Sequence, residues 1–164
     1  MSTNSSRPGR PPGPGVAFTL AQLGAYATDL FARRMNQLGL SPAQAGFLRM
    51  VAAAPGRSQK ELAEDLGMPP SRFVPFADEL DQKGLIERRK NPDDRRLHAL
   101  YLTEAGRRLL GEVAKAGMAH EQQVCAGLSP DEHDQLLDLL LRIAGTQGLK
   151  DGVHPGYRAT PATA

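Results

Sequence analysis

The sequence predicts a mainly α-helical fold that contains one small β-hairpin. Three observations support this prediction. Apolar residues recur every three or four positions over most of the chain, helix-capping patterns separate these stretches, and two strand-like segments flank one polar turn. At 164 residues, the chain suits one domain of ordinary size with tails. The predicted order is four helices, the hairpin and two more helices.

The first two helices are defined by their apolar spacing and by their start and stop signals. Residues 16–40 carry a stripe of apolar residues spaced by three and four positions. These are Leu20, Leu23, Ala27, Leu30, Phe31, Met35 and Leu38. Ser41 followed by Pro42 is a start signal, because serine caps helices and proline is favoured in the first turn. The second helix should then run to its stop at Pro55 and Gly56.

Two short helices come next, and a turn of three or four residues separates them. Ser58 and Glu61 have the spacing of a capping box, and Gly67 ends the helix that they start. The following helix carries its apolar residues on one face until Gly84 stops it. These apolar residues are Phe73, Phe76, Ala77 and Leu80. The pair predicts a helix-turn-helix.

A β-hairpin and two further helices complete the predicted fold. Residues 85–102 contain two strand-like stretches around a polar connection that is rich in turn residues. Thr103 then caps a long helix, and a capping pattern at Ser129 starts the last one. We expect Gly145 and Gly148 to end this last helix.

Composition and charge limit the kinds of function. The net charge is only +2, so a nucleic-acid surface has to come from local clusters of basic residues. Cys125 is the single cysteine, so no internal disulfide forms, and no apolar run reaches the length of a membrane span. We therefore expect a cytoplasmic protein. Residues 1–15 predict a disordered tail and residues 149–164 a flexible one, because both are rich in Pro, Gly and small residues.

Basic residues gather where a helix-turn-helix would meet DNA. The second helix of such a motif lies in the major groove, and an arginine near its start can donate two hydrogen bonds to guanine. An arginine at the tip of a basic hairpin can enter the minor groove. The alternative is that these charges only solvate an exposed hairpin. The predicted DNA-binding residues are Ser58, Gln59, Pro70, Ser71, Arg72, Pro75, Arg88, Arg89, Lys90, Asp94, Arg95 and Arg96.

Several motifs resemble those of the MarR family of winged helix-turn-helix regulators. The similarity runs from Leu38 to Gly106. Its most specific part is Asp94–Arg96 followed by Leu102–Gly106, which resembles the wing of the family and the entry to the next helix. Leu80–Ile86 together with Arg88 resembles the exit of the recognition helix.

The resemblance implies a winged helix-turn-helix over residues 41–102 and dimerisation helices at residues 16–40 and 103–148. It implies a homodimer that binds a pseudo-palindromic operator in double-stranded DNA, usually as a repressor. Arg96, oriented by Asp94, matches the wing arginine of the family.

The resemblance also implies a small aromatic or phenolic effector. The candidate pocket residues are Tyr26, Phe31, Phe47 and Met50, and the alternative is that these side chains belong to the ordinary core. Pro75 departs from the family pattern, because proline inside a helix removes a hydrogen bond and can bend the helix. This departure concerns the base contacts and not the fold.

Other interpretations remain open beside DNA binding. A winged helix can bind a protein partner instead. Cys125 can sense oxidants if its thiol is activated, and the alternative is an inert, half-buried cysteine. His120, Glu121, Cys125 and His133 carry zinc-ligand atoms, but their spacing matches no strong signature, so we expect no metal and no other cofactor. The chain has no nucleophile motif or phosphate-binding loop, so we do not expect it to be an enzyme.

Overall fold

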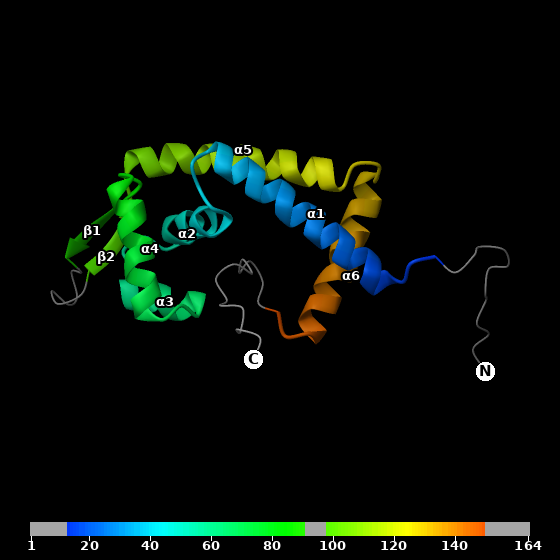
Figure 1. Ribbon diagram of the computed structural model, residues 1–164, viewed down its shortest axis with the longest axis horizontal. Helices are drawn as coiled ribbons and strands as arrows, with labels where there is room; N and C mark the ends of the chain where they lie inside the picture. The colour runs from blue at the N-terminus through cyan, green and yellow to red at the C-terminus, as the bar shows by residue number, and fades with distance from the viewer. Residues whose placement is uncertain (1–12, 91–97, 150–164) are drawn as a thin grey trace.

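The computed structural model describes residues 13–90 and 98–149. In these two ranges the chain forms six helices and one two-stranded antiparallel sheet, which confirms the predicted fold class. The elements are α1 (Val16–Gln37), α2 (Pro42–Ala53), α3 (Gln59–Leu66), α4 (Pro70–Gln82), β1 (Ile86–Lys90), β2 (His98–Leu102), α5 (Glu104–Val124) and α6 (Pro130–Thr146). Figure 1 shows α5 along the length of the molecule, with the hairpin, α3 and α4 near one end and α6 at the other.

Side-chain caps begin four of these helices where the sequence predicts them. The side chains of Ser41, Ser58 and Ser129 each accept a hydrogen bond from the backbone N–H three residues later. In return, the Gln or Glu side chain at that later position accepts a hydrogen bond from the backbone N–H of the serine. Thr103 accepts from the backbone of Gly106 at the start of α5. One predicted stop is wrong: α6 runs through Gly145 to Thr146, and Gly148, with a φ of 65°, follows its end. A glycine inside a helix lowers helix stability but does not itself end the helix.

The hairpin is attached to the start of α3. Its register pairs Ile86 with Leu102 and Lys90 with His98. On the other side of β2, the N–H of Gly56 donates to the carbonyl of Leu100 at 3.0 Å, and the N–H of Leu100 donates to the carbonyl of Arg57 at 3.0 Å. This pairing holds the beginning of α3 and the hairpin in a defined relative position.

The hydrophobic core lies within the helix-turn-helix lobe and reaches α1 and α5. Phe47 of α2 is fully buried, and its ring packs edge-on against Phe73 and Phe76 of α4. Leu62, Leu80 and other buried residues of α3, α4 and the hairpin belong to the same cluster. Since these contacts join α4 to α2, α3 and the hairpin, they determine which face of α4 is turned inward.

Gly106 allows α5 to lie directly against the end of α4. The hydroxyl of Thr103 donates to the carbonyl of Gly84 at 2.6 Å, and the N–H of Thr103 donates to the carbonyl of Leu85 at 3.1 Å. A Cβ atom on Gly106 would lie 2.0 Å from the Leu85 carbonyl oxygen. This close approach requires glycine and explains the Thr103–Gly106 part of the motif.

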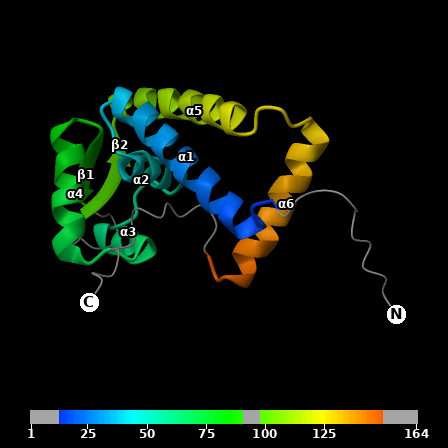
Figure 2. The ribbon, with the colours of Figure 1, turned by 45° about the vertical axis from the view of Figure 1, so that its right-hand side comes forward.

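The outer helices leave much of their apolar surface uncovered. No residue of α6 is buried, although the helix carries five exposed large apolar side chains. These are Leu136, Leu137, Leu139, Leu141 and Ile143. The N-terminal half of α1 is similar, with Val16, Phe18, Leu23 and Tyr26 exposed. Figure 2 shows α6 turning away from α5 at the end opposite the hairpin. No helix in the described part of the chain has the length and apolar character needed to cross a membrane.

Candidate nucleic-acid interface

The N-terminal half of helix α4 is exposed to solvent on the face opposite the core. Its start follows the turn at Gly67–Pro69, where Gly67 adopts a left-handed conformation with a φ of 61°. Phe73, Ala77 and Leu80 are buried, so the opposite face points outward. Ser71, Arg72, Val74 and Pro75 are exposed on it. The guanidinium group of Arg72 has no hydrogen bond or ion pair with the described residues.

Two prolines change the chemistry of the α4 N-terminus. Pro69 is the cap residue and Pro70 the first helical residue, and neither has an N–H. The N–H groups of Arg72 and Phe73 both donate to the carbonyl of Pro69 at 2.9 Å. The N–H of Ser71 is therefore the one donor of the first turn that no described residue uses. A helix end binds anions through such free donors, so the two prolines leave this helix end with fewer of them.

Pro75 lies inside α4 without ending it. The helix continues from Pro70 to Gln82 as one element. Pro75 has no N–H to donate to the Ser71 carbonyl, so the helix loses one backbone hydrogen bond near its exposed face. Val74 is 45% exposed beside it, which makes this part of the face apolar.

The start of α3 lies next to the same surface. Ser58 is buried because its side chain caps α3, whereas Lys60 is exposed. A hollow of about 480 Å³ joins the beginnings of α3 and α4 to the beginning of β2. Its lining includes Ser58, Gln59, Lys60, Pro70, Val74 and His98. The structure thus brings three of the predicted residues together, and it adds Lys60, Val74 and His98, which the sequence analysis did not select.

The basic residues of β1 have different surroundings. The guanidinium of Arg88 contacts Asp78 at 2.5 Å and Asp81 at 2.7 Å, and only 22% of its side chain is exposed. Arg89 forms an ion pair with Glu87 and lies over the Tyr101 ring, 4.5 Å from the ring centre. Arg88 therefore attaches the hairpin to α4.

Lys90 and the hairpin tip complete the set of predicted contacts. Lys90 is exposed at the end of β1 and makes no ion pair with the described residues. Asp94, Arg95 and Arg96 lie outside the described residues.

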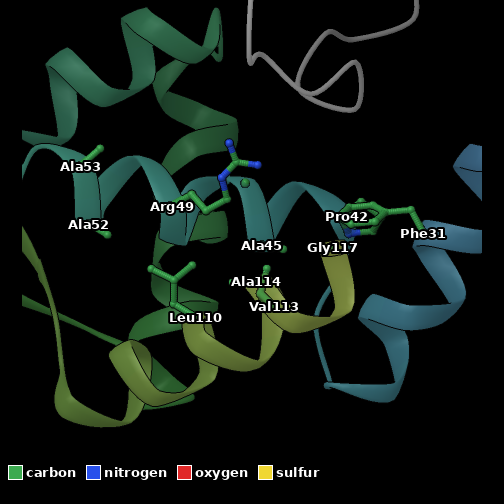
Figure 3. A pocket seen from close by; sticks show the side chains of 11 residues that line it. Phe31, Pro42, Ala45, Arg49, Ala52, Ala53, Leu110, Val113, Ala114 and Gly117 are labelled. Atoms are coloured by element: carbon green, nitrogen blue, oxygen red, sulfur yellow. The ribbon is translucent and has the colours of Figure 1, made fainter. Parts of the chain in front are cut away.

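A cavity is lined by residues of α1, α2 and α5. Its volume is about 730 Å³, and its lining is apolar apart from the side chain of Arg49 (Figure 3). Phe31, Pro42, Leu110, Val113 and Gly117 are among its lining residues. Of the predicted effector residues, only Phe31 lines it.

The other predicted effector residues lie elsewhere. Phe47 packs in the core against α4, and Met50 is half-buried against that core. The hydroxyl of Tyr26 accepts a hydrogen bond from Gln123 at 3.0 Å. The apolar periodicity of α2 could not separate residues that face the core from residues that face the cavity, because both faces are apolar.

Cys125 lies at the end of α5. Burial raises the pKa of its thiol, and the nearby Glu121 carboxylate raises this pKa further. The thiolate is the form that reacts with oxidants, so a raised pKa makes the thiol a slow nucleophile at neutral pH. These surroundings do not favour an oxidant sensor.

Comparison with known proteins agrees with this architecture. The profile of the MarR family matches residues 38–97. A protein of Thauera aromatica, named as a transcriptional regulatory protein for the hcr operon, is 36% identical over 114 residues, which cover 69% of each chain. The transcriptional repressor CouR bound to a 23-mer DNA duplex is 34% identical, with a TM-score of 0.68, over 79% of this chain and 92% of that chain.

CouR bound to p-coumaroyl-CoA is a second similar structure. It is 32% identical, has a TM-score of 0.64, and is matched over 79% of this chain and 91% of that chain. The overall fold of the present chain, six helices and one two-stranded hairpin in the described residues, is similar to both structures. The chain therefore belongs to the MarR family of DNA-binding transcriptional regulators.

Proposed function

We propose that this protein acts as a homodimer that represses transcription from a pseudo-palindromic operator, and that a small aromatic effector releases it from DNA. The observation that carries the proposal is the exposed start of α4 beside the basic hairpin, where Arg72 pairs with none of the residues that the structure describes. Such a regulator works in the compartment that holds the DNA, for which we propose the cytoplasm. We expect no enzymatic activity.

In this proposal, α4 reads bases and its neighbours bind the backbone. Arg72 donates two hydrogen bonds to a guanine, and Ser71 donates to a base or a phosphate. Val74 and Pro75 supply an apolar surface that suits a thymine methyl group. Gln59 and Lys60 line the hollow beside this surface, and Lys90 pairs with His98 of the same lining. These three residues contact phosphates and set the position of α4 without selecting a sequence.

The homodimer is proposed from the apolar surface of α1 and α6. Because α6 buries none of its residues within the monomer, its row of leucines needs a partner to leave water. A second copy offers a matching apolar surface, and two-fold symmetry places two α4 helices on one duplex. Half-sites about one helical turn apart follow from that geometry.

We place the effector in the cavity between α2 and α5. A volume of about 730 Å³ falls in the range of small-molecule sites, and the apolar lining suits an aromatic ring. Arg49 supplies one cation for an acidic or phosphate group of the effector. The protein named CouR binds p-coumaroyl-CoA, which combines these two features. Since α5 follows directly on β2, an effector that favours one position of α5 changes the separation of the DNA-reading helices.

The operator can be identified by selection. DNA fragments that the purified protein retains from a random library at physiological salt should share a palindrome. Affinity should fall steeply as salt rises, because phosphate contacts release counterions. Fragments without a common sequence, or affinity that is independent of salt, would contradict the proposal and favour a protein-interaction role.

The effector site can be tested with two probes, p-coumarate and p-coumaroyl-CoA. Either probe should release the operator from the wild-type protein, and Arg49→Ala should need at least tenfold more of it, the loss expected for a charged hydrogen bond of about 1.5 kcal/mol or more. Lys115→Ala, which removes an exposed cation of α5 outside the cavity lining, serves as the matched control. Equal release from both variants would exclude Arg49 from the effector site.

A further inference from the structure

The corner between α5 and α6 depends on few interactions. Helix α6 leaves the end of α5 and buries none of its residues (Figure 1). Nε2 of His133 lies 2.8 Å from a carboxylate oxygen of Glu121, which links the first turns of α6 to the last turns of α5. A hollow of about 320 Å³ opens at this corner, lined among others by Glu121, Cys125 and His133.

Three different metal-ligand atoms meet in this hollow. They are the Glu121 carboxylate oxygen, the Cys125 sulfur and an imidazole nitrogen of His133, and all lie within 4.8 Å of one another. Glu121 lies in the last turn of α5 and Cys125 is the cap residue that follows the helix, and the thiol of Cys125 donates to the Glu121 carboxylate at 3.5 Å. His133 comes from the second helix, so the set exists only because the chain turns at this corner.

We propose that Glu121, Cys125 and His133 form a zinc site at the α5–α6 corner, with water as the fourth ligand. Zinc binds thiolate sulfur, imidazole nitrogen and carboxylate oxygen, usually in a tetrahedron, at about 2.0–2.3 Å. In such a tetrahedron the ligand atoms are about 3.3–3.6 Å apart. The Glu121 carboxylate oxygen already lies 3.5 Å from the Cys125 sulfur and 2.8 Å from Nε2 of His133, and the hollow of about 320 Å³ is open beside them.

The surroundings of His133 support a ligand role. Its other ring nitrogen, Nδ1, lies 3.3 Å from the Asp134 carboxylate. When Nδ1 carries the proton and donates to a carboxylate, Nε2 keeps its lone pair for a metal, and this arrangement is common around protein-bound zinc. The capping box of Ser129 and Glu132 fixes the first turn of α6, on which His133 lies.

A bound ion would join α6 to α5 more firmly than the polar contacts do. A surface ion pair such as that of His133 with Glu121 contributes little to stability, because water screens both groups. Zinc would replace it with one bond from each of three side chains and would displace the thiol proton of Cys125. If α6 forms the proposed dimer interface, the ion also restricts that interface. This consequence rests on the proposed function, whereas the metal site does not.

The site can be tested on the full-length protein after removal of metal with a chelator. Titration with Co²⁺ alone should give one equivalent of binding per chain, with a thiolate-to-cobalt absorption band and the strong visible bands of a tetrahedral ion. One equivalent of Zn²⁺ should abolish both. Cys125→Ser should lose the thiolate band, and His133→Ala and Glu121→Gln should each weaken Zn²⁺ binding at least tenfold in competition with a chelating dye. Asp134→Asn should weaken it by about 10–100-fold, as expected for a group that orients a ligand.

Two controls make the result decisive. His98→Gln removes an exposed histidine of β2, far from the corner, and should leave metal binding unchanged. Circular dichroism confirms that each variant is folded. The proposal is overturned if wild-type protein gives no thiolate-to-cobalt band, or if the band persists with equal affinity in folded His133→Ala and Glu121→Gln, since the thiol would then bind cobalt without the other two ligands. Because the measurement involves no DNA, failure of the operator experiment would not affect it.

Discussion

Arg72 and Arg88 carry the same charge, but their guanidinium groups are in opposite situations. Arg72 is exposed on α4 and has no partner among the described residues. Arg88 is held between Asp78 and Asp81 of α4. A guanidinium that is already paired with two carboxylates gains little from a base or phosphate, because it must first give up these contacts. Arg88 therefore attaches the hairpin to α4, and we propose that Arg72 reads bases.

Replacement of Arg72 tests this assignment. Arg72→Ala should weaken operator binding by about 1–3 kcal/mol and relax the preference at one base pair in each half-site, because two hydrogen bonds to a guanine are lost. Competition binding against operators changed one base pair at a time measures both effects. The control is Lys115→Ala, which removes a cation of α5 that pairs with Glu112 and should change neither operator affinity nor base preference. Unchanged base preference in Arg72→Ala would exclude Arg72 from base recognition.

Two glycines of α5 allow the effect of close packing on stability to be distinguished from the effect of helix propensity. Gly106→Ala should destabilise the protein by about 1–3 kcal/mol, because the added methyl group overlaps the Leu85 carbonyl and the backbone must move. Gly111→Ala should instead stabilise it by up to about 1 kcal/mol, since nothing lies within 4 Å of a Cβ there and alanine favours helix. Denaturant unfolding at a fixed protein concentration measures both. Equal stability of the two variants would contradict the close approach.

At the scale of elements, α3 depends on its capping box. Ser58 caps the helix, and the Glu61 carboxylate accepts from both the backbone N–H and the hydroxyl of Ser58 at 2.8 and 2.7 Å. These bonds lower the pKa of Glu61. The start of α3 lies beside the proposed phosphate contacts, so the cap also positions the interface.

Ser58→Ala should lower the free energy of unfolding by about 1 kcal/mol, the usual value of a helix cap. The dependence of the free energy of unfolding on pH should change as well. A carboxylate whose pKa is lower in the folded state stabilises the fold above the unfolded pKa of glutamic acid, and this contribution is lost as pH falls through the folded pKa. Without the Ser58 hydroxyl, the pKa of Glu61 should be lowered less in the folded state, so less stability should be lost in acid. Denaturant unfolding between neutral pH and pH of about 3 measures it. Thr28→Ala, at an exposed position of α1, should leave the pH dependence unchanged.

The elements themselves could be predicted closely from the sequence, whereas their contacts could not. Serine or threonine caps and apolar spacing are local signals, and they located the starts of α2, α3, α5 and α6. The pairing of Arg88 with Asp78 depends on how β1 packs against α4, and the exposure of Arg49 to the cavity depends on the position of α5. No local pattern specifies either distance.

At the scale of the whole molecule, the exposed leucines of α6 are the main unexplained surface of the monomer. Leu137→Asp should prevent or strongly weaken association, because a charge without a partner would enter the proposed apolar interface. Operator affinity should fall with it, since each half-site would be bound separately. Sedimentation or light scattering over a range of protein concentrations measures the association.

Gln135→Asp adds the same charge to an exposed polar position of α6 and is the matched control. The control should remain dimeric and bind the operator as the wild type does. A dimer of normal mass in Leu137→Asp would show that association uses another surface.

The sequence by itself determined the fold class, most helix starts and the basic character of the hairpin, because capping and residue periodicity act over one or two turns of chain. Only the tertiary structure decided that Arg88 pairs with α4 whereas Arg72 pairs with none of the described residues. It also decided which apolar residues line the cavity rather than the core, and that Glu121, Cys125 and His133 meet at one corner. These features join residues from different elements. Their distances are determined by how helices and strands pack on one another, which no short stretch of sequence contains.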